Sequence, residues 1–455
     1  MYSVRNNKIR LSDYFTYRRL IQFATPSVIM MLFASMYGAV DGYFVSNYVG
    51  ITAFASVNMI LPYVQIVGGL GVMLGADGSA LIARTLGMGN REKAGRYFTM
   101  TMIVTLISGL VLTVMGLVAL RPVAFYLGAT EEMLNDCMTY GKICLLFNTA
   151  QLAQNIFQGY LIIAQKPKIA LRVMCLSGIL NVVLDILFMH EGFLNMGVAG
   201  AAWATGISQT VAALIPLIWF ISKRNNSALR FRRTKLEAKV IRRASMTGSA
   251  DTISSLSAYI IGILYNIQFM NNAGEDGVAA YGVVMYVSFV YMAMFSGYSS
   301  GASPIMGYHF GAGNKREMRN VFKKSIVILL CSALLITTVG LIFAKPLASI
   351  FVGNDKELLE LTAKSLVVCM IPYLLMWFNI YLTSVFSALN KGGMAAFLTI
   401  LRVVIFPIAC LIAMPIIFNF QEVWCALAGA EIMCCIIALF CLLTQRRKFT
   451  YQKVR

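Results

Sequence analysis

The chain repeats one short motif, and the repeat predicts a fold built from two similar halves. Residues 86–93 read LGMGNREK, and residues 310–317, which lie 224 positions later, read FGAGNKRE. Each copy follows two apolar segments, precedes a third and carries basic residues just after its glycines. Equal spacing in equal context indicates that a whole bundle of helices is duplicated. Two such bundles are typical of proteins that expose a central site to one side of a membrane at a time.

The composition predicts a polytopic membrane protein. Hydrophobic residues make up 59% of the 455 residues and charged residues 13%, which leaves too few polar groups to solvate a globule. Apolar runs of about 20 residues predict an all-α protein with twelve transmembrane helices in two pseudo-symmetric six-helix lobes. The expected spans are residues 20–45, 53–78, 95–119, 138–163, 169–190, 197–221, 244–270, 278–300, 320–343, 362–388, 394–417 and 422–444.

Positive charge predicts the orientation of these spans. With the N-terminus inside, 33 of the 38 Lys and Arg residues fall in cytoplasmic segments, and Arg402 is counted among them. The positive-inside rule therefore places both termini in the cytoplasm. The same rule and the attraction of anionic membrane lipid account for the net charge of +19, so we expect no nucleic-acid partner.

The longest polar stretch divides the chain into two lobes. Residues 223–243 hold nine basic residues against the single acidic residue Glu237. We expect them to form a basic cytoplasmic linker that lies on the inner membrane surface as an amphipathic helix. The linker separates an N-lobe of residues 1–222, with spans 1 to 6, from a C-lobe of residues 244–455, with spans 7 to 12.

The ten cysteines and two histidines give no sign of a metal or redox centre. The cysteines are scattered through apolar spans without a Cys-x-x-Cys pair, and the adjacent Cys434 and Cys435 suit neither a disulfide nor a zinc site. His190 and His309 lack carboxylate or cysteine partners at ligand spacing. We therefore expect no metal centre and no cofactor other than a coupling ion.

Four polar residues inside the spans are candidates for an ion site, because an ionisable group in hydrocarbon must be compensated or used. Asp41 in span 1 and Asp185 in span 5 reach similar depths if each helix rises about 1.5 Å per residue. Asn181 lies one turn before Asp185 on the same helix face, and Thr205 in span 6 reaches a comparable depth. These oxygen and amide groups suit a proton or a hard cation such as sodium.

Two carboxylates in one apolar site can act as an ion switch. Burial in a low dielectric favours the protonated form of a carboxylate, and a second carboxylate nearby adds to this effect. A proton can then bind near neutral pH, with sodium as the alternative ion. The competing interpretation is that these polar groups only hold helices together by hydrogen bonds.

Three further acidic residues lie in or near spans. Asp77 and Asp251 lie near inner ends, where they can cap helices or pair with arginines. Glu431 lies deeper, in span 12, where it can touch a substrate or close a local hydrogen-bond network.

Several motifs occur together along the chain: Asn181-x-x-x-Asp185, GVAGAAWATGISQ at residues 197–209, Pro26, Asp41 and the two Gly-x-Gly-Asn loops. In this combination the whole chain resembles the multidrug and toxic compound extrusion (MATE) family, closest to its DinF-like branch. The resemblance implies a V-shaped central cavity and export of small organic cations by antiport with protons or sodium. It also implies the cytoplasmic membrane of a prokaryote, and an ion site in the N-lobe at Asp41, Asn181, Asp185 and Thr205.

The resemblance further implies that span 1 bends at Pro26. A proline inside a helix removes a backbone hydrogen bond, which gives such a bend a physical cause, whereas a proline in the first turn would not. Other branches of the family place acidic coupling residues in spans 7 and 10. Span 10 has none here and Asp251 lies near an inner end, so we expect no coupling through the C-lobe.

Aromatic, methionine and amide side chains are candidates for the substrate cavity, because they bind flat cations by dispersion and cation–π contact. The candidates are Tyr37, Gln65, Gln151, Asn155, Tyr281, Met285, Tyr286 and Met294. We expect a monomer.

Two other functions are compatible with parts of the sequence. A flippase for lipids or lipid-linked saccharides needs cationic side chains for its head group, and we expect no Arg or Lys deep in the spans. An intramembrane enzyme can use two aspartates as an acid pair, but no Gly-Asp motif, zinc motif or nucleophile elbow accompanies them.

Overall fold

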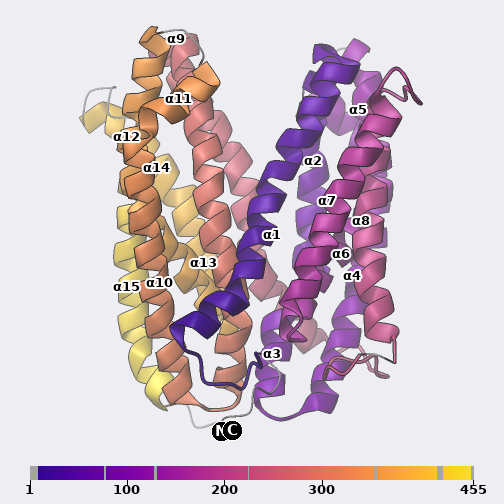
Figure 1. Cartoon of the computed structure of the whole chain (residues 1–455), viewed down its shortest axis with the longest axis vertical. Coiled ribbons are helices and arrows are strands. Elements are labelled where there is room, and N and C mark those ends of the chain that lie inside the picture. The colour runs from indigo at the N-terminus through magenta and orange to yellow at the C-terminus, as the bar shows by residue number, and fades with distance from the viewer. Residues whose placement is uncertain are drawn as a thin grey trace, which may run out of the picture.

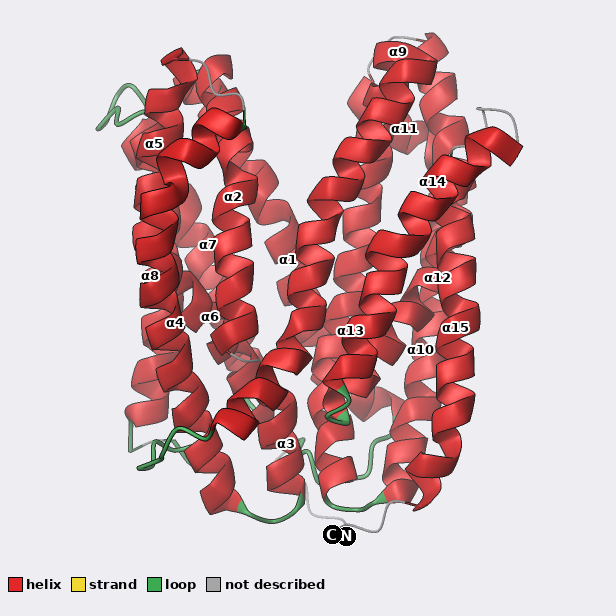
Figure 2. Cartoon of the chain, turned by 180° about the vertical axis from the view of Figure 1, so that it is seen from behind, coloured by secondary structure: helices red, strands yellow, loops and turns green. Residues whose placement is uncertain are grey.

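The computed structural model describes residues 9–75, 78–127, 131–223, 225–352, 356–417 and 424–451. Figures 1 and 2 show two helical bundles that meet at the end where α1 starts and α15 ends, here called the closed end, and diverge away from it. The N-lobe contains α1 (Tyr17–Phe44), the π-helical turn η1 (Val45–Val49), α2 (Ile51–Gly75), α3 (Ser79–Gly87), α4 (Arg91–Tyr126), α5 (Glu131–Leu146), α6 (Asn148–Ile163), α7 (Pro167–Met189) and α8 (Val198–Ile221). The C-lobe contains α9 (Ala238–Gly311), α10 (Lys315–Ile342), α11 (Ala344–Val352), α12 (Lys356–Ala388), α13 (Gly392–Ile400), the π-helical turn η2 (Leu401–Ile405), α14 (Phe406–Ile417) and α15 (Cys425–Tyr451).

The helices agree with the twelve expected spans. Among the described residues, eight helical segments are long and apolar enough to cross a membrane, and α12, bent by 44° next to Pro372, adds a ninth. The other three spans are interrupted or less apolar: α2 contains Pro62, α5 and α6 meet at Phe147, and the last is the first part of α9.

The helix α9 has 74 residues and doubles back on itself. In a straight helix the sixteen positions from Tyr265 to Tyr281 would span about 24 Å. Their rings instead stack with centroids 5.1 Å apart, and Phe269 stacks on Tyr281 at 5.3 Å. The chain therefore reverses between Phe269 and Tyr281, and α9 supplies the two antiparallel spans expected as spans 7 and 8.

The first helix joins the two lobes. Its lower part packs on α9, where Ala24 and Val28 lie against glycines of that helix, and its upper part packs on α7 (Figure 1). Pro26 is the tenth residue of α1, so the alternative that it occupies the first turn is wrong. The bend expected at Pro26 stays a prediction.

Most of the linker between the lobes is not helical, although an amphipathic helix was expected. Residues 225–237 contain no helix and pack on α4, while residues 238–243 form the start of α9. The N–H of Arg232 donates to Thr99 Oγ1 at 2.9 Å, and the ring of Phe231 lies 5.0 Å from that of Phe98. Leu229, two positions before Phe231, is fully buried. Apolar side chains two residues apart share one face of an extended strand, which explains why this segment is not helical.

The repeated Gly-x-Gly-Asn motif forms two turns at the closed end. Its second glycine, Gly89 or Gly313, has a φ of 80° or 67°, which glycine adopts without strain. Its asparagine caps the next helix: Asn90 Oδ1 accepts the N–H of Lys93 at 2.9 Å, and Asn314 repeats this bond at 3.1 Å. The second glycine and the asparagine of the motif thus turn the chain and start a helix.

The two asparagine caps lead to a stability prediction. Asn90→Ala and Asn314→Ala are each expected to lower the free energy of unfolding by about 1 kcal/mol, while aspartate keeps the acceptor and the stability. Thermal unfolding of the purified protein in detergent measures this effect. Asn58→Ala is the control, because the exposed Asn58 bonds only the carbonyl of Phe54 on its own helix. An equal loss in all three alanine variants would show that the caps add nothing.

The first glycine of each copy lets the lobes touch. A Cβ added at Gly87 would lie 1.9 Å from the carbonyl oxygen of Tyr308, and one added at Gly311 would lie 1.9 Å from that of Arg84. Arg84 and Tyr308 are themselves 224 positions apart, so one contact is made twice about a pseudo-two-fold axis. The backbones of α3 and α9 thus meet with no room for a side chain.

Residues 9–16 form a strap across the closed end. They lead into α1 but bind α10: the N–H of Phe15 donates to Glu317 Oε1 at 2.8 Å. Asn320 and Lys324 donate to the carbonyl oxygen of Phe15 at 3.0 Å and 2.7 Å. The strap therefore fastens the start of α1 to the C-lobe.

Candidate ion and substrate site

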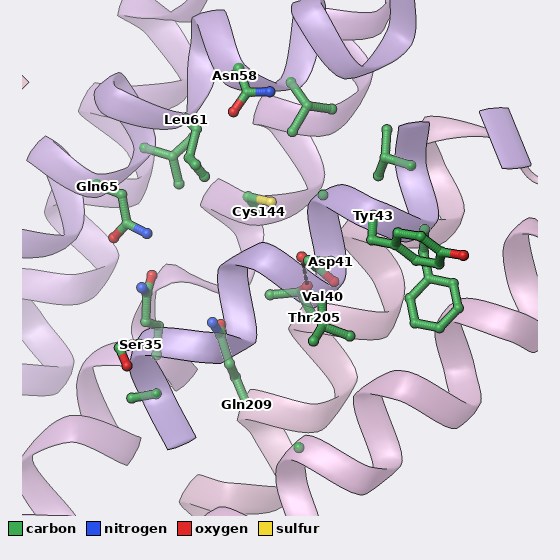
Figure 3. A pocket seen from close by; sticks show the side chains of 18 of the residues that line it. Ser35, Val40, Asp41, Tyr43, Asn58, Leu61, Gln65, Cys144, Thr205 and Gln209 are labelled. Carbon is green, nitrogen blue, oxygen red and sulfur yellow. Dashed lines mark hydrogen bonds between the residues drawn. The ribbon is translucent and has the colours of Figure 1, made fainter. Parts of the chain in front are cut away.

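A cavity of about 1340 Å³ lies between the lobes, and most of its wall belongs to the N-lobe. The N-lobe contributes a row of polar side chains, several of which are labelled in Figure 3. Its amides are Asn47, Asn58, Gln65, Gln151, Gln154, Asn155 and Gln209. The C-lobe contributes only apolar residues to the described lining, namely Val287, Phe289, Val290 and Leu347. Among the described lining residues there is no lysine or arginine, and Asp41 is the only acidic residue.

The carboxylate of Asp41 is held at this wall by hydrogen bonds from two other helices, and Figure 3 shows the bond from Thr205. Thr205 Oγ1 of α8 donates to Asp41 Oδ2 at 3.1 Å, and Asn181 Nδ2 of α7 donates to Asp41 Oδ1 at 3.4 Å. Asn181 Nδ2 also lies 3.4 Å from Thr205 Oγ1. Three of the four predicted ion-site residues are therefore brought together by direct bonds.

Asp185 lies one turn further along α7 and completes the group. Its exposed fraction is 0%, as is that of Asn181, and its charge and that of Asp41 act directly on each other. Neither carboxylate oxygen of Asp185 receives a hydrogen bond from an amide or hydroxyl group of the described residues, and Asn181 Oδ1 likewise has no donor there. The carboxyl group of Asp185 lies close enough to that of Asp41 to share a hydrogen bond with it when one of the two is protonated. A buried carboxylate without donors is costly unless a proton or a cation neutralises it. These atoms therefore fit a bound proton or hard cation.

Local features of three helices place the group. Asp41 lies in the last turn of α1, four residues before the π-helical turn η1 begins. Such π turns are frequent at functional positions. Ser208 Oγ donates to the carbonyl of Thr205 at 2.8 Å, and Ser177 Oγ of α7 donates to the carbonyl of Ser208 at 2.9 Å. These bonds fix α7 against α8 beside the carboxylates.

The predicted substrate residues divide into three groups. Gln65, Gln151 and Asn155 line the cavity. Tyr281 and Met285 lie in or against an apolar core of the C-lobe, and Met294 is half-buried on α9, outside the described lining. The side chains of Tyr37 and Tyr286 lie outside the described residues. Sequence reasoning missed Asn58, Gln154 and Gln209, although an amide inside an apolar span is a visible signal.

Glu431 forms a buried polar cluster in the C-lobe. Arg402 Nε donates to Glu431 Oε1 at 2.9 Å, and Asn379 Nδ2 donates to Glu431 Oε2 at 2.6 Å. Arg402 is not in an inner loop, as the charge count assumed, because it lies inside the apolar segment Gly392–Ala413 with 10% of its side chain exposed. The expectation that no arginine lies deep in a span is therefore wrong. Asp77 and the side chain of Asp251 lie outside the described residues.

Comparisons with known proteins agree with this architecture. The sequence profile of the family described as MatE matches residues 26–187 and 252–412, one stretch in each lobe. The multidrug export protein MepA of Staphylococcus saprophyticus is 25% identical over 443 residues, covering 96% of each chain. MepA of Staphylococcus haemolyticus is 24% identical over 438 residues, covering 96% of this chain and 95% of that one. The crystal structure of MATE in the straight conformation has the same fold, with a TM-score of 0.89, 22% identity and 98% of each chain covered. The chain is thus a multi-pass membrane protein that belongs to the MatE family.

Proposed function

We propose that this protein exports organic cations by antiport with protons, with sodium as the alternative ion. The observation that carries the proposal is the pair Asp41 and Asp185, held by Asn181 and Thr205 at the wall of the central cavity. The relatives named above are described as multidrug export proteins, which agrees with a secondary transporter rather than an enzyme.

The orientation follows from the charge distribution. Lys and Arg residues gather in the segments on the side of the termini, so the closed end faces the cytoplasm and the cavity faces outward. The outward cavity is the state in which a drug leaves and an ion enters. The opposite state requires separation of the contact between Gly87 and Tyr308 and of its repeat at Gly311.

The transport cycle uses the charge of the carboxylate pair. When Asp41 and Asp185 are ionised, the N-lobe wall is negative and attracts a cationic drug. An ion from outside neutralises the pair, weakens the attraction and releases the drug outward. Each ligand must bind the two conformations unequally, since equal binding shifts no equilibrium.

A proton makes a smaller demand on this site than sodium does. Sodium requires about five or six oxygen ligands, which is nearly all of the side-chain oxygens that Asp41, Asp185, Asn181 and Thr205 offer together. A proton needs only one carboxylate and an acceptor beside it. A flippase for lipid-linked sugars is disfavoured because the described cavity lining offers no lysine or arginine to a phosphate.

The test is efflux of ethidium from proteoliposomes under an imposed proton gradient and then a sodium gradient. Wild type is expected to export dye under one gradient, while Asp41→Asn and Asp185→Asn lose at least about 90% of this flux because an amide cannot carry the ion. Asp276→Asn is the matched control, since Asp276 is exposed on α9. Dye flux that is absent in folded wild type, or unchanged in both variants, would contradict the proposal, and the first result would favour a lipid substrate.

A further inference from the structure

The internal repeat relates the buried cluster of the C-lobe to the part of the N-lobe cavity wall that adjoins the ion site. The offset between the lobes is 224 positions at the repeated motif and 225 at the turn that precedes α7 and α13, where Gln165 and Asn390 both have positive φ. With either offset, Asn379 corresponds to residues 154–155, Arg402 to 177–178 and Glu431 to 206–207. Of these six N-lobe positions, five line the central cavity beside Asp41.

The Asp41 site and the Glu431 cluster differ in charge. In the N-lobe the carboxylate of Asp41 receives bonds only from neutral donors, Thr205 and Asn181. In the C-lobe the carboxylate of Glu431 receives a guanidinium of the chain itself at 2.9 Å and an amide at 2.6 Å. Glu431 and Arg402 are both largely buried, so each is the main counter-charge of the other. The N-lobe has no such built-in cation among its described residues.

Each of the two sites also includes or adjoins a π-helical turn, although the two turns are not equivalent in the repeat. Arg402 is part of η2, inside the apolar segment Gly392–Ala413, and Asp41 lies four residues before η1, at the end of α1. Turns of this kind are frequent at functional positions. Asn379 donates to both the carboxylate and the carbonyl oxygen of Glu431, at 2.6 Å and 3.2 Å, which fixes the acid on α15 against α12.

We propose that Arg402 is a tethered cation that takes the place of a coupling ion at Glu431, the buried carboxylate of the C-lobe. A proton or sodium ion that reached Glu431 would have to displace a guanidinium that has no other charged partner among the described residues. A buried charge left without its partner is strongly unfavourable, so the ion does not bind there. The C-lobe therefore contributes no coupling ion, and removal of the guanidinium uncovers a second cation site on Glu431. This inference rests on the proposed function of the N-lobe site.

The decisive experiment counts bound cations in purified protein whose N-lobe site has been removed by Asp41→Asn and Asp185→Asn. Proton uptake across neutral pH and equilibrium binding of ²²Na⁺ are measured on the same samples. The background protein is expected to bind no cation inside either lobe. Adding Arg402→Met is expected to give one bound cation per protein, and adding Glu431→Gln to that variant is expected to remove this cation again. Arg402→Lys in the same background keeps a positive charge and is expected to bind none.

Two results would overturn the inference. One is a cation bound by the background itself and lost with Glu431→Gln while Arg402 is intact, and the other is no gain in folded Arg402→Met protein. If Arg402→Met does not fold, the test uses Glu431→Gln in the otherwise native chain. The inference requires this variant to bind as many cations per protein as wild type does. Failure of the proposed function is seen separately, as an equal ion count in wild type and in the Asp41→Asn and Asp185→Asn background.

Discussion

Gly311→Ala is expected to stop drug export while each lobe stays folded, and Gly87→Ala is expected to do the same. In each case the new methyl group would lie 1.9 Å from a backbone carbonyl oxygen of the other lobe, which cannot rotate away as a side chain can. The lobes must separate to relieve this clash. If the clash costs about 3 kcal/mol, the outward-open state falls about hundredfold in population relative to the inward-open state.

Two measurements check this expectation. Dye efflux reports the loss of transport, and the distance between spin labels at Glu92 and Arg316 in a cysteine-free background reports separation of the closed end. These two residues are exposed, lie 224 positions apart and directly follow the two turns at the closed end. Gly393→Ala is the matched control, because its added Cβ meets only the end of the Met246 side chain at 3.5 Å. Normal transport by Gly311→Ala would contradict the prediction, because it would show that α3 and α9 can move apart at the closed end without loss of export.

Asn181→Leu is expected to reduce gradient-driven export by about tenfold or more, because burial of a carboxylate without its donor is costly. The amide of Asn181 serves both Asp41 and Thr205, and its exposed fraction of 0% means that water cannot replace it. Leucine has a similar size and removes both bonds at once. The coupling of ion binding to drug release should suffer more than drug binding itself.

The check on Asn181→Leu compares the initial rate of efflux with the affinity for ethidium, measured on the same preparation. Asn47→Leu is a control of the same chemistry. The exposed Asn47 lines the cavity, and among the described residues its side chain donates to the carbonyl of Tyr43, one turn earlier, and to no other helix. Equal losses of efflux rate in both variants would mean that export depends on the polarity of the cavity wall in general and not on the bonds of Asn181.

The carboxylate site could be predicted because polar residues are conspicuous in an apolar sequence. Asn181 and Asp185 share a helix face, and the similar depth of Asp41 follows from counting residues along a span. That α1, α7 and α8 adjoin at one site was implied by the family resemblance, because similar depth alone does not make two spans neighbours. The positions of Tyr281 and Met285 could not be predicted in the same way. Apolar residues cover every face of a membrane helix, and hydropathy does not tell which face meets a cavity and which meets another helix.

Arg402 shows a second limit of sequence reasoning. Counting positive charge assigns every arginine to a loop, and this average rule fails for an arginine whose partner is an acid 29 positions away on another helix. The role of the repeated motif was also beyond the sequence. Its spacing indicated a duplication, but only the fold shows that one glycine of each copy carries the contact between the lobes.

The strap of residues 9–16 connects the C-lobe mechanically to the candidate ion site of the N-lobe. Its backbone is held by three side chains of α10, while its continuation, α1, carries Asp41 into the ion site of the other lobe. One continuous stretch of chain therefore runs from a fastening on the C-lobe to the carboxylate of the candidate ion site in the N-lobe. A force applied to the strap would act on the same helix as an ion bound at Asp41.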